Sequence, residues 1–311
     1  MNARFAIALV LVAAGAAAAE DHQAIPAVQG IVQAFDKHPV VIIAESRHGL
    51  KQTGEFYVSL VRDPAFQNAV HDIVIEFASR NNQPLLDRYV RGDNVPIEEA
   101  RHIWRDTTKV ASWEFPVYAE WLAAIRDVNR TLPVERRFRV WAGDTAVDWS
   151  RMHTHEDWVA LGDNNISFAE VIVDKILKQK RRAFVVLGGN HVTKSGDRTG
   201  GPNTTTRVEA RYPGSTYVVL HHIAPPGTDE VPHLADPHAS ALFDLAGTSV
   251  GAPALSYGDA WLYVGPSPEL RDSVPPPGSL ESEYMKEVDR RSMIEWGELR
   301  GRKFLGAAAA K

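Results

Sequence analysis

A carboxylate and an imidazole stand three residues apart at the end of an apolar run. Residues 40–48 read Val-Val-Ile-Ile-Ala-Glu-Ser-Arg-His, so Glu45 and His48 follow a stretch typical of a buried strand. Such a pair can transfer protons or bind a metal ion. Because ligands bind at the carboxyl ends of strands in open α/β sheets, Glu45 and His48 lie where chemistry is expected.

Three more strand-like segments also run into polar residues. They are residues 73–77, 137–141 and 183–187, and they bring Glu76, Asp144 and the turn Gly188-Gly-Asn-His191. If the strands are parallel, their ends share one edge of the sheet. We therefore expect Glu45, His48, Glu76 and His191 to form one centre, with Asp144 at its margin. Each residue alone could be the first exposed position after a strand, so the prediction depends on their convergence.

The order of the segments predicts the fold class. Strand-like runs alternate with helical patterns, which is typical of an α/β protein with a largely parallel central sheet, here of five to six strands, covered by helices on both faces. Residues 84–130 carry only helical patterns and three tryptophans. We expect them to be crossover helices that partly cap the site.

The ends of the chain and its composition limit the function further. Residues 1–19 resemble a signal peptide, with Arg4, an apolar run over 5–12 and three alanines at 17–19. We expect export to the periplasm or the medium, with no membrane anchor after cleavage. An α/β domain over 20–270 then precedes a Pro-rich linker, a terminal helix and a disordered tail in 271–311.

The chain has 311 residues, a net charge of −5 and no cysteine. Disulfides, a thiolate nucleophile and lipid attachment through cysteine are therefore excluded. A nucleic-acid partner is not expected, because phosphate binding needs a basic patch.

In combination, these motifs resemble the erythromycin-esterase-like proteins. The segments that carry the resemblance are Ala44–Gly49, Glu55-Phe56, Ile75-Glu76 and Gly188–His191. The wider superfamily also contains the TIKI metalloproteases, the TraB proteins and the ChaN-type haem-binding lipoproteins. Ala44 departs from the glycine usual in that position, and the lipoproteins' anchoring cysteine is missing.

The resemblance implies a hydrolase that attacks an ester, lactone or amide of a small-molecule or peptide substrate with water. His48 would be the general base, Glu76 would orient the water or His48, and His191 would stabilise the oxyanion or protonate the leaving group. The metalloprotease branch implies instead one divalent metal ion at Glu45, His48 and His191. Both routes to water activation stay open here.

Two other functions are compatible with the same residues. One is a periplasmic protein that binds haem or another ligand without turnover, and the other is a degenerate member kept for protein contacts. Arg47 and Arg80 could hold an anionic group, and one of His221 and His222 should face the crevice. Ser249, within Gly247-Thr-Ser-Val-Gly251, is set aside as a nucleophile because Pro253 interrupts the required helix.

Overall fold

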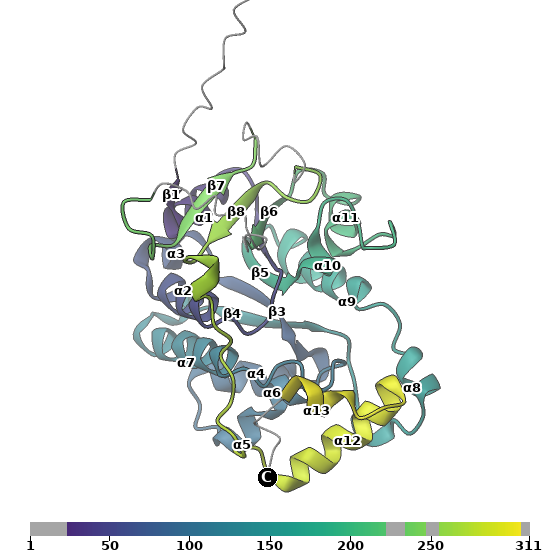
Figure 1. Cartoon of the computed structure of the whole chain (residues 1–311). Coiled ribbons are helices and arrows are strands. Elements are labelled where there is room, and N and C mark those ends of the chain that lie inside the picture. The colour runs from purple at the N-terminus through teal and green to yellow at the C-terminus, as the bar shows by residue number, and fades with distance from the viewer. Residues whose placement is uncertain (1–23, 222–233, 247–254, 306–311) are drawn as a thin grey trace, which may run out of the picture.

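The computed structural model describes residues 24–221, 234–246 and 255–305, which form one eight-stranded sheet flanked by helices (Figure 1). The strand order is β1-β7-β8-β6-β2-β5-β3-β4. The strands are β1 (Ile25–Pro26), β2 (Val40–Glu45), β3 (Asp72–Ser79), β4 (Arg139–Asp144), β5 (Ala183–Gly188), β6 (Thr216–His221), β7 (Ala241–Asp244) and β8 (Ala260–Tyr263).

The six strands from β8 to β4 are mutually parallel, which confirms the predicted α/β class and its largely parallel sheet. The two remaining strands were not predicted. β7 runs antiparallel to β8, and β1 runs antiparallel to β7. β1 is the edge strand and contains a proline, and β7 lies between β1 and β8. Both are too short to carry the apolar alternation by which a strand is recognised.

Alternate residues of the central strands enter two separate cores, because successive side chains of a strand point to opposite faces. Val41 and Ile43 of β2 belong to the core on one face, whereas Val40 and Ile42 belong to the core on the other. Strand β2 is buried along its whole length. This explains its continuous apolar run, since a central parallel strand is covered on both faces.

The first face is covered mainly by α1 (Ala27–Ala34), α2 (Lys51–Arg62), α3 (Pro64–Ala69), α4 (Gln83–Arg91) and α7 (Pro116–Thr131). The second is covered by α9 (Asn164–Val171), its π-helical continuation Ile172–Leu177 and α11 (Thr204–Glu209). Shorter helices are α5 (Ile97–Ala100), α6 (His102–Arg105), α8 (His155–Val159) and α10 (Gly189–Val192), with 3-10 turns at Arg80–Asn82, Val134–Arg136, Trp149–Arg151 and Ser267–Glu269.

The last helices, α12 (Ser282–Trp296) and α13 (Arg300–Leu305), lie away from the strands, in yellow in Figure 1. They share a third apolar cluster with Val110 and Trp149. Glu295 of α12 accepts hydrogen bonds from Nζ of Lys109 and the backbone N–H of Val110, both at 3.1 Å. Helix α12 therefore holds the loop that follows α6, and this loop reaches the site.

The segment 84–130 therefore contains a crossover helix and also a loop that lies beside the site. Helix α7 packs on α2 against the sheet, as a crossover helix does. The loop between α6 and α7 instead turns toward the carboxyl ends of the strands. Within the described ranges, no helix is long and apolar enough to cross a membrane. The predicted signal peptide lies outside these ranges.

Candidate active site

Strand β2 delivers Glu45 to the edge of the sheet, beside Gly188 of β5 in the register of the two strands. Oε2 of Glu45 lies 2.8 Å from Nδ1 of His48. Two buried tyrosines also donate to this carboxylate, Tyr57 to Oε1 at 3.0 Å and Tyr118 to Oε2 at 2.9 Å. Only 4% of the Glu45 side chain is exposed, against 33% for His48, so the acid is enclosed and the imidazole is accessible.

The hydrogen bonds around Glu45 fix its charge. Burial favours the neutral acid, but the hydrogen bond and charge of His48, with the two tyrosines, outweigh it and lower the pKa of Glu45. For His48, burial lowers the pKa, but the hydrogen bond to Glu45 and the charges of Glu76 and Glu45 raise it above the ordinary value.

The proton positions follow from this. Burial and the Glu45 carboxylate raise the pKa of Tyr57 and Tyr118 well above the ordinary range, so both hydroxyls stay protonated. Tyr118 also accepts the backbone N–H of Gly49, so its own proton is directed to Glu45. An ionised Glu45 can only accept, and His48 therefore keeps a proton on Nδ1 and presents Nε2 to the site.

The second carboxylate–imidazole pair consists of Glu76 and His191. Oε2 of Glu76 accepts the backbone N–H of Gly188, and Oε1 lies 3.5 Å from Nε2 of His191. On its other side, Nδ1 of His191 lies 2.9 Å from Oδ1 of Asn165. The His191 side chain is 23% exposed, so this pair also reaches solvent.

Gly188 lies between the two pairs, where a larger residue would crowd both of them. A Cβ at this position would lie 3.2 Å from Nε2 of His48 and 3.3 Å from Oε2 of Glu76. The Gly188 backbone, with φ −57° and ψ 143°, is in a region open to any residue, so conformation does not demand glycine here. The requirement is for space: the absent side chain leaves a small volume bounded by an imidazole nitrogen and a carboxylate oxygen.

Asp144 ends β4 and lies beside this centre without hydrogen-bonding to either histidine. Its carboxylate accepts the backbone N–H of Thr108 at 2.6 Å and the Thr108 hydroxyl at 2.8 Å. Burial, with a contribution from the charge of Glu76, raises the pKa of Asp144 to about 7. Asp144 therefore ties the loop after α6 to the edge of the sheet.

The remaining sequence candidates lie around the centre or outside the description. Arg47 pairs with Asp272 at 2.5 Å, and Arg80 pairs with Glu170 at 3.0 Å, both on the surface. His221 is buried at the end of β6, with Nε2 2.9 Å from Oγ1 of Thr53. His222 and Ser249 fall outside the described residues.

The candidate metal ligands already have hydrogen-bond partners. Both oxygens of Glu45 already accept hydrogen bonds, from Tyr57, Tyr118 and His48. Nδ1 of His48 faces Glu45, and Nδ1 of His191 faces Asn165. In the part of the chain that the structure describes, no group of three or more His, Asp or Glu side chains could hold a metal ion. These residues do not fit the predicted metal site at Glu45, His48 and His191.

Four residues that contact the centre were not predicted. Tyr57 and Tyr118 hold Glu45, Asn165 holds His191, and the ring of Trp113 meets that of His48 edge-on with centroids 4.7 Å apart. Tyr57 lies on α2, 12 positions after Glu45, among other apolar residues of that helix. The other three come from α7, α9 and the loop before α7, where no local pattern distinguishes them.

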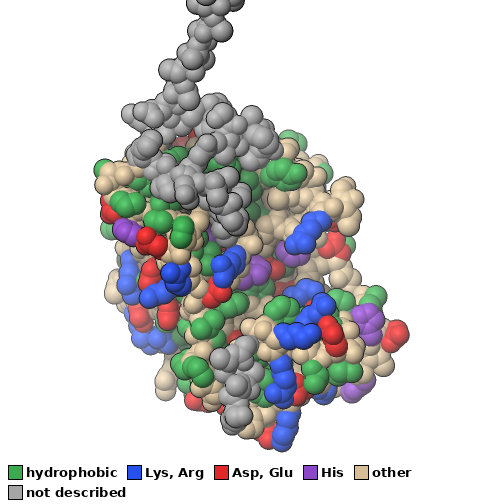
Figure 2. All heavy atoms as spheres, in the orientation of Figure 1, with side chains coloured by type: hydrophobic (Ala, Val, Ile, Leu, Met, Phe, Trp, Pro, Cys, Tyr) green, Lys and Arg blue, Asp and Glu red, His purple; other side chains and the backbone are tan. Residues whose placement is uncertain are grey.

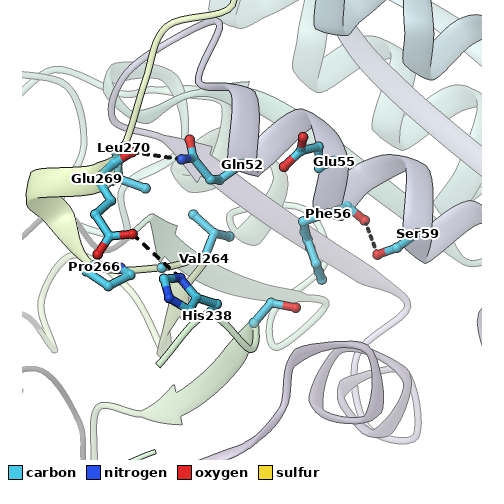
Figure 3. Close-up of a pocket in the computed structure, with 11 residues that line it drawn as sticks. Gln52, Glu55, Phe56, Ser59, His238, Val264, Pro266, Glu269 and Leu270 are labelled. Atoms are coloured by element: carbon cyan, nitrogen blue, oxygen red, sulfur yellow. Dashed lines mark hydrogen bonds and ion pairs between the residues drawn. The ribbon is translucent and has the colours of Figure 1, made fainter. Parts of the chain in front are cut away.

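Histidine and acidic side chains come to the surface together near the middle of the face in Figure 2. A separate cavity of about 310 Å³ lies on the outer side of α2 and is drawn in Figure 3. There Gln52 and Phe56 of α2 face Glu269 and His238. None of the four central residues lines this cavity, so we assign it no chemistry.

No protein-family model and no curated protein matches this sequence. Among solved structures, a Bacillus cereus protein is similar with a TM-score of 0.52 and 10% identity, covering 76% of this chain and 91% of that one. ChaN of Campylobacter jejuni, described with cofacial haem, gives a TM-score of 0.43 and 11% identity over 75% of this chain and 90% of that one. The type III effector HopBA1 gives 0.45 and 14% over 79% and 99%. At 10% identity, the likeness to the Bacillus cereus protein establishes a shared α/β fold and no activity.

Proposed function

We propose that this protein is a hydrolase of the erythromycin-esterase-like kind, in which His48 activates water to cleave an ester, lactone or amide. The observation that carries the proposal is the hydrogen bonding of Glu45. An ionised carboxylate, held by two tyrosine hydroxyls, fixes the proton of His48 on Nδ1 and leaves Nε2 as a base. An imidazole oriented in this way by an enclosed carboxylate is the arrangement that hydrolases use for general base catalysis.

The space over Gly188 supports a position for the attacking water. Nε2 of His48 and Oε2 of Glu76 border this space, and both can accept a hydrogen bond. A water molecule that donates one proton to each directs its lone pairs outward, toward a bound carbonyl carbon. As the oxygen attacks, one of its protons passes to Nε2 of His48.

Glu76 and His191 supply the second half of the reaction. The two groups face each other across 3.5 Å, and a proton held between them can pass to the leaving oxygen or nitrogen. The proton gained by His48 then passes to solvent, and the Glu76–His191 pair regains one proton from solvent, so both groups return to their starting states. The step needs no external redox partner, and the bond that breaks is the one between the carbonyl carbon and the leaving group.

We also propose that the protein is exported to the periplasm or the medium, on the basis of the signal-like residues 1–19, and that it acts on a small-molecule or peptide substrate. We expect no nucleic-acid partner, because the net charge is negative. The shallow exposure of both histidines suits a substrate that approaches from the surface.

A substrate panel tests the function directly. Purified protein, with and without chelator, is assayed on aryl and alkyl esters, lactones and short peptides, and in parallel is titrated with haem. Hydrolysis that persists in chelator supports the proposal. A Soret band on haem addition, together with no turnover on any substrate, would replace it with the ligand-binding function.

A further inference from the structure

Asn165 is a buried amide whose oxygen lies at the centre of a cluster of donors. Its side chain is at the start of α9, and the residue is 7% exposed. Oδ1 accepts the backbone N–H of Thr204 at 3.2 Å and the Thr204 hydroxyl at 3.1 Å, and it lies 2.9 Å from Nδ1 of His191. The amide therefore connects α9, α11 and the turn that carries His191.

The orientation of this amide is determined by its partners. Nδ2 of Asn165 donates to Oδ1 of Asp163 at 2.8 Å, and an ionised carboxylate can only accept. The backbone N–H of Thr204 can only donate, so the atom that faces it must be the amide oxygen. Exchange of the amide oxygen and nitrogen would break both bonds.

The state of the imidazole follows from the orientation of the amide. Since Oδ1 of Asn165 has no proton, the ring must supply one from Nδ1. Nε2 then faces Oε1 of Glu76, and the edge of the ring meets Phe168 with centroids 5.1 Å apart. The ring is hydrogen-bonded at Nδ1 and packed on one side, so it cannot flip without losing its hydrogen bond to Asn165.

We propose that Asn165 is the positioning residue that fixes His191 in its Nδ1–H form and aims Nε2 at Glu76. The effect of Asn165 on kcat rests on the proposed hydrolase function, whereas its effect on the tautomer of His191 does not. Asn165 plays toward His191 the part that Glu45 plays toward His48, with one difference in charge.

The experiment is nitrogen NMR on uniformly ¹⁵N-labelled protein, with the His191 signals assigned by their absence in His191→Gln. Long-range proton–nitrogen correlations distinguish a protonated ring nitrogen from one with a lone pair. At a pH where the ring is neutral, the wild type is expected to show a protonated Nδ1 and a lone-pair Nε2. A wild-type ring protonated on Nε2 overturns the proposal without any variant having to fold.

Two variants extend the test. Asn165→Ala is expected to lose the preference and to show a mixture of tautomers at His191. Asn129→Ala is the matched control, because Asn129 is another buried amide, bonded to Val90 and Phe138 far from the site. It should lose stability without altering His191. An unchanged tautomer in Asn165→Ala, or an equal change in Asn129→Ala, contradicts the assignment.

If hydrolysis is found, Asn165→Ala should lower kcat by about 10- to 100-fold, as loss of the hydrogen-bond partner of a ligating histidine does at metal sites, with a smaller effect on KM. The two proposals fail separately. A wild type that hydrolyses nothing removes the proposed function and leaves the tautomer result standing. A wrong tautomer in an active protein removes the role of Asn165 alone.

Discussion

Substitution of Gly188 by alanine tests the volume between His48 and Glu76 with a single methyl group. The backbone at Gly188 suits alanine, and the N–H that Glu76 accepts is retained. The new Cβ would lie 3.1 Å from Cε1 and 3.2 Å from Nε2 of His48. These contacts are tight, so the side chains must yield by a few tenths of an ångström, and the methyl occupies the place we assign to the attacking water.

The expected cost to folding is small. Overpacking costs about 1–3 kcal/mol in a closed core, but the His48 side chain is one-third exposed and can move. Replacement of glycine at a compatible backbone position returns roughly 0.4–1 kcal/mol through the unfolded chain. The expected cost to catalysis is large, because the methyl takes the place of the attacking water, and displacement of a reacting group by only about 1 Å lowers a rate about 100-fold.

The assay compares kcat/KM and the free energy of unfolding for the wild type, Gly188→Ala and Gly189→Ala. Gly189 is the matched control, since a Cβ there meets its nearest neighbour, the Glu45 carbonyl oxygen, at an ordinary 3.5 Å. Gly189→Ala should keep its activity to within about twofold. Full activity in Gly188→Ala, or equal losses in the two variants, would refute the placement of the water.

Three further predictions concern charge and hydrogen bonding. Glu45→Gln should lower kcat/KM by about 10²–10⁴-fold and shift the acidic limb of the pH–rate profile to lower pH, because Glu45 raises the pKa of His48; an unmoved limb contradicts this. Tyr118→Phe should destabilise the protein by about 1–3 kcal/mol and Tyr57→Phe by about 1 kcal/mol, because only Tyr118 also accepts a backbone N–H; chemical denaturation with the reverse order counts against it. Burial raises the pKa of Asp144 to about 7, so the folded state binds this proton more tightly than the unfolded chain does. The stabilisation that this proton gives the folded state is complete below about pH 4 and is lost as the pH rises through about 7. Between pH 4 and 8 the free energy of unfolding of the wild type should fall by up to about 4 kcal/mol through this group, and Asp144→Asn should not show that fall. Denaturation at each pH measures it, and parallel curves of unfolding free energy against pH for the variant and the wild type would contradict it.

The central strands could be predicted from sequence because burial on both faces leaves a strong local signal. Residues 40–44 and 183–187 are continuous apolar runs, and the structure places both in the middle of the sheet. The convergence of Glu45 and Glu76 with the two histidines then follows from parallel strands. The short strand β7 could not be predicted, since its pairing with β8 depends on a tertiary contact.

The residues that hold the candidate groups were out of reach for a related reason. Tyr118 is 73 positions from Glu45, and Asn165 is 26 positions from His191. A tyrosine on a helix and an asparagine after an aspartate are common features, and only the packed fold gives them partners. The pairing of Arg80 with Glu170 belongs to the same class of contact.

The role of His48 as general base is tested by the kcat/KM of His48→Ala on a substrate that the wild type hydrolyses. We expect kcat/KM to fall about 10²–10⁴-fold, with circular dichroism and the thermal midpoint close to those of the wild type, because His48 is partly exposed and lies outside the main cores. Hydrolysis at the wild-type rate by a folded His48→Ala protein would contradict it.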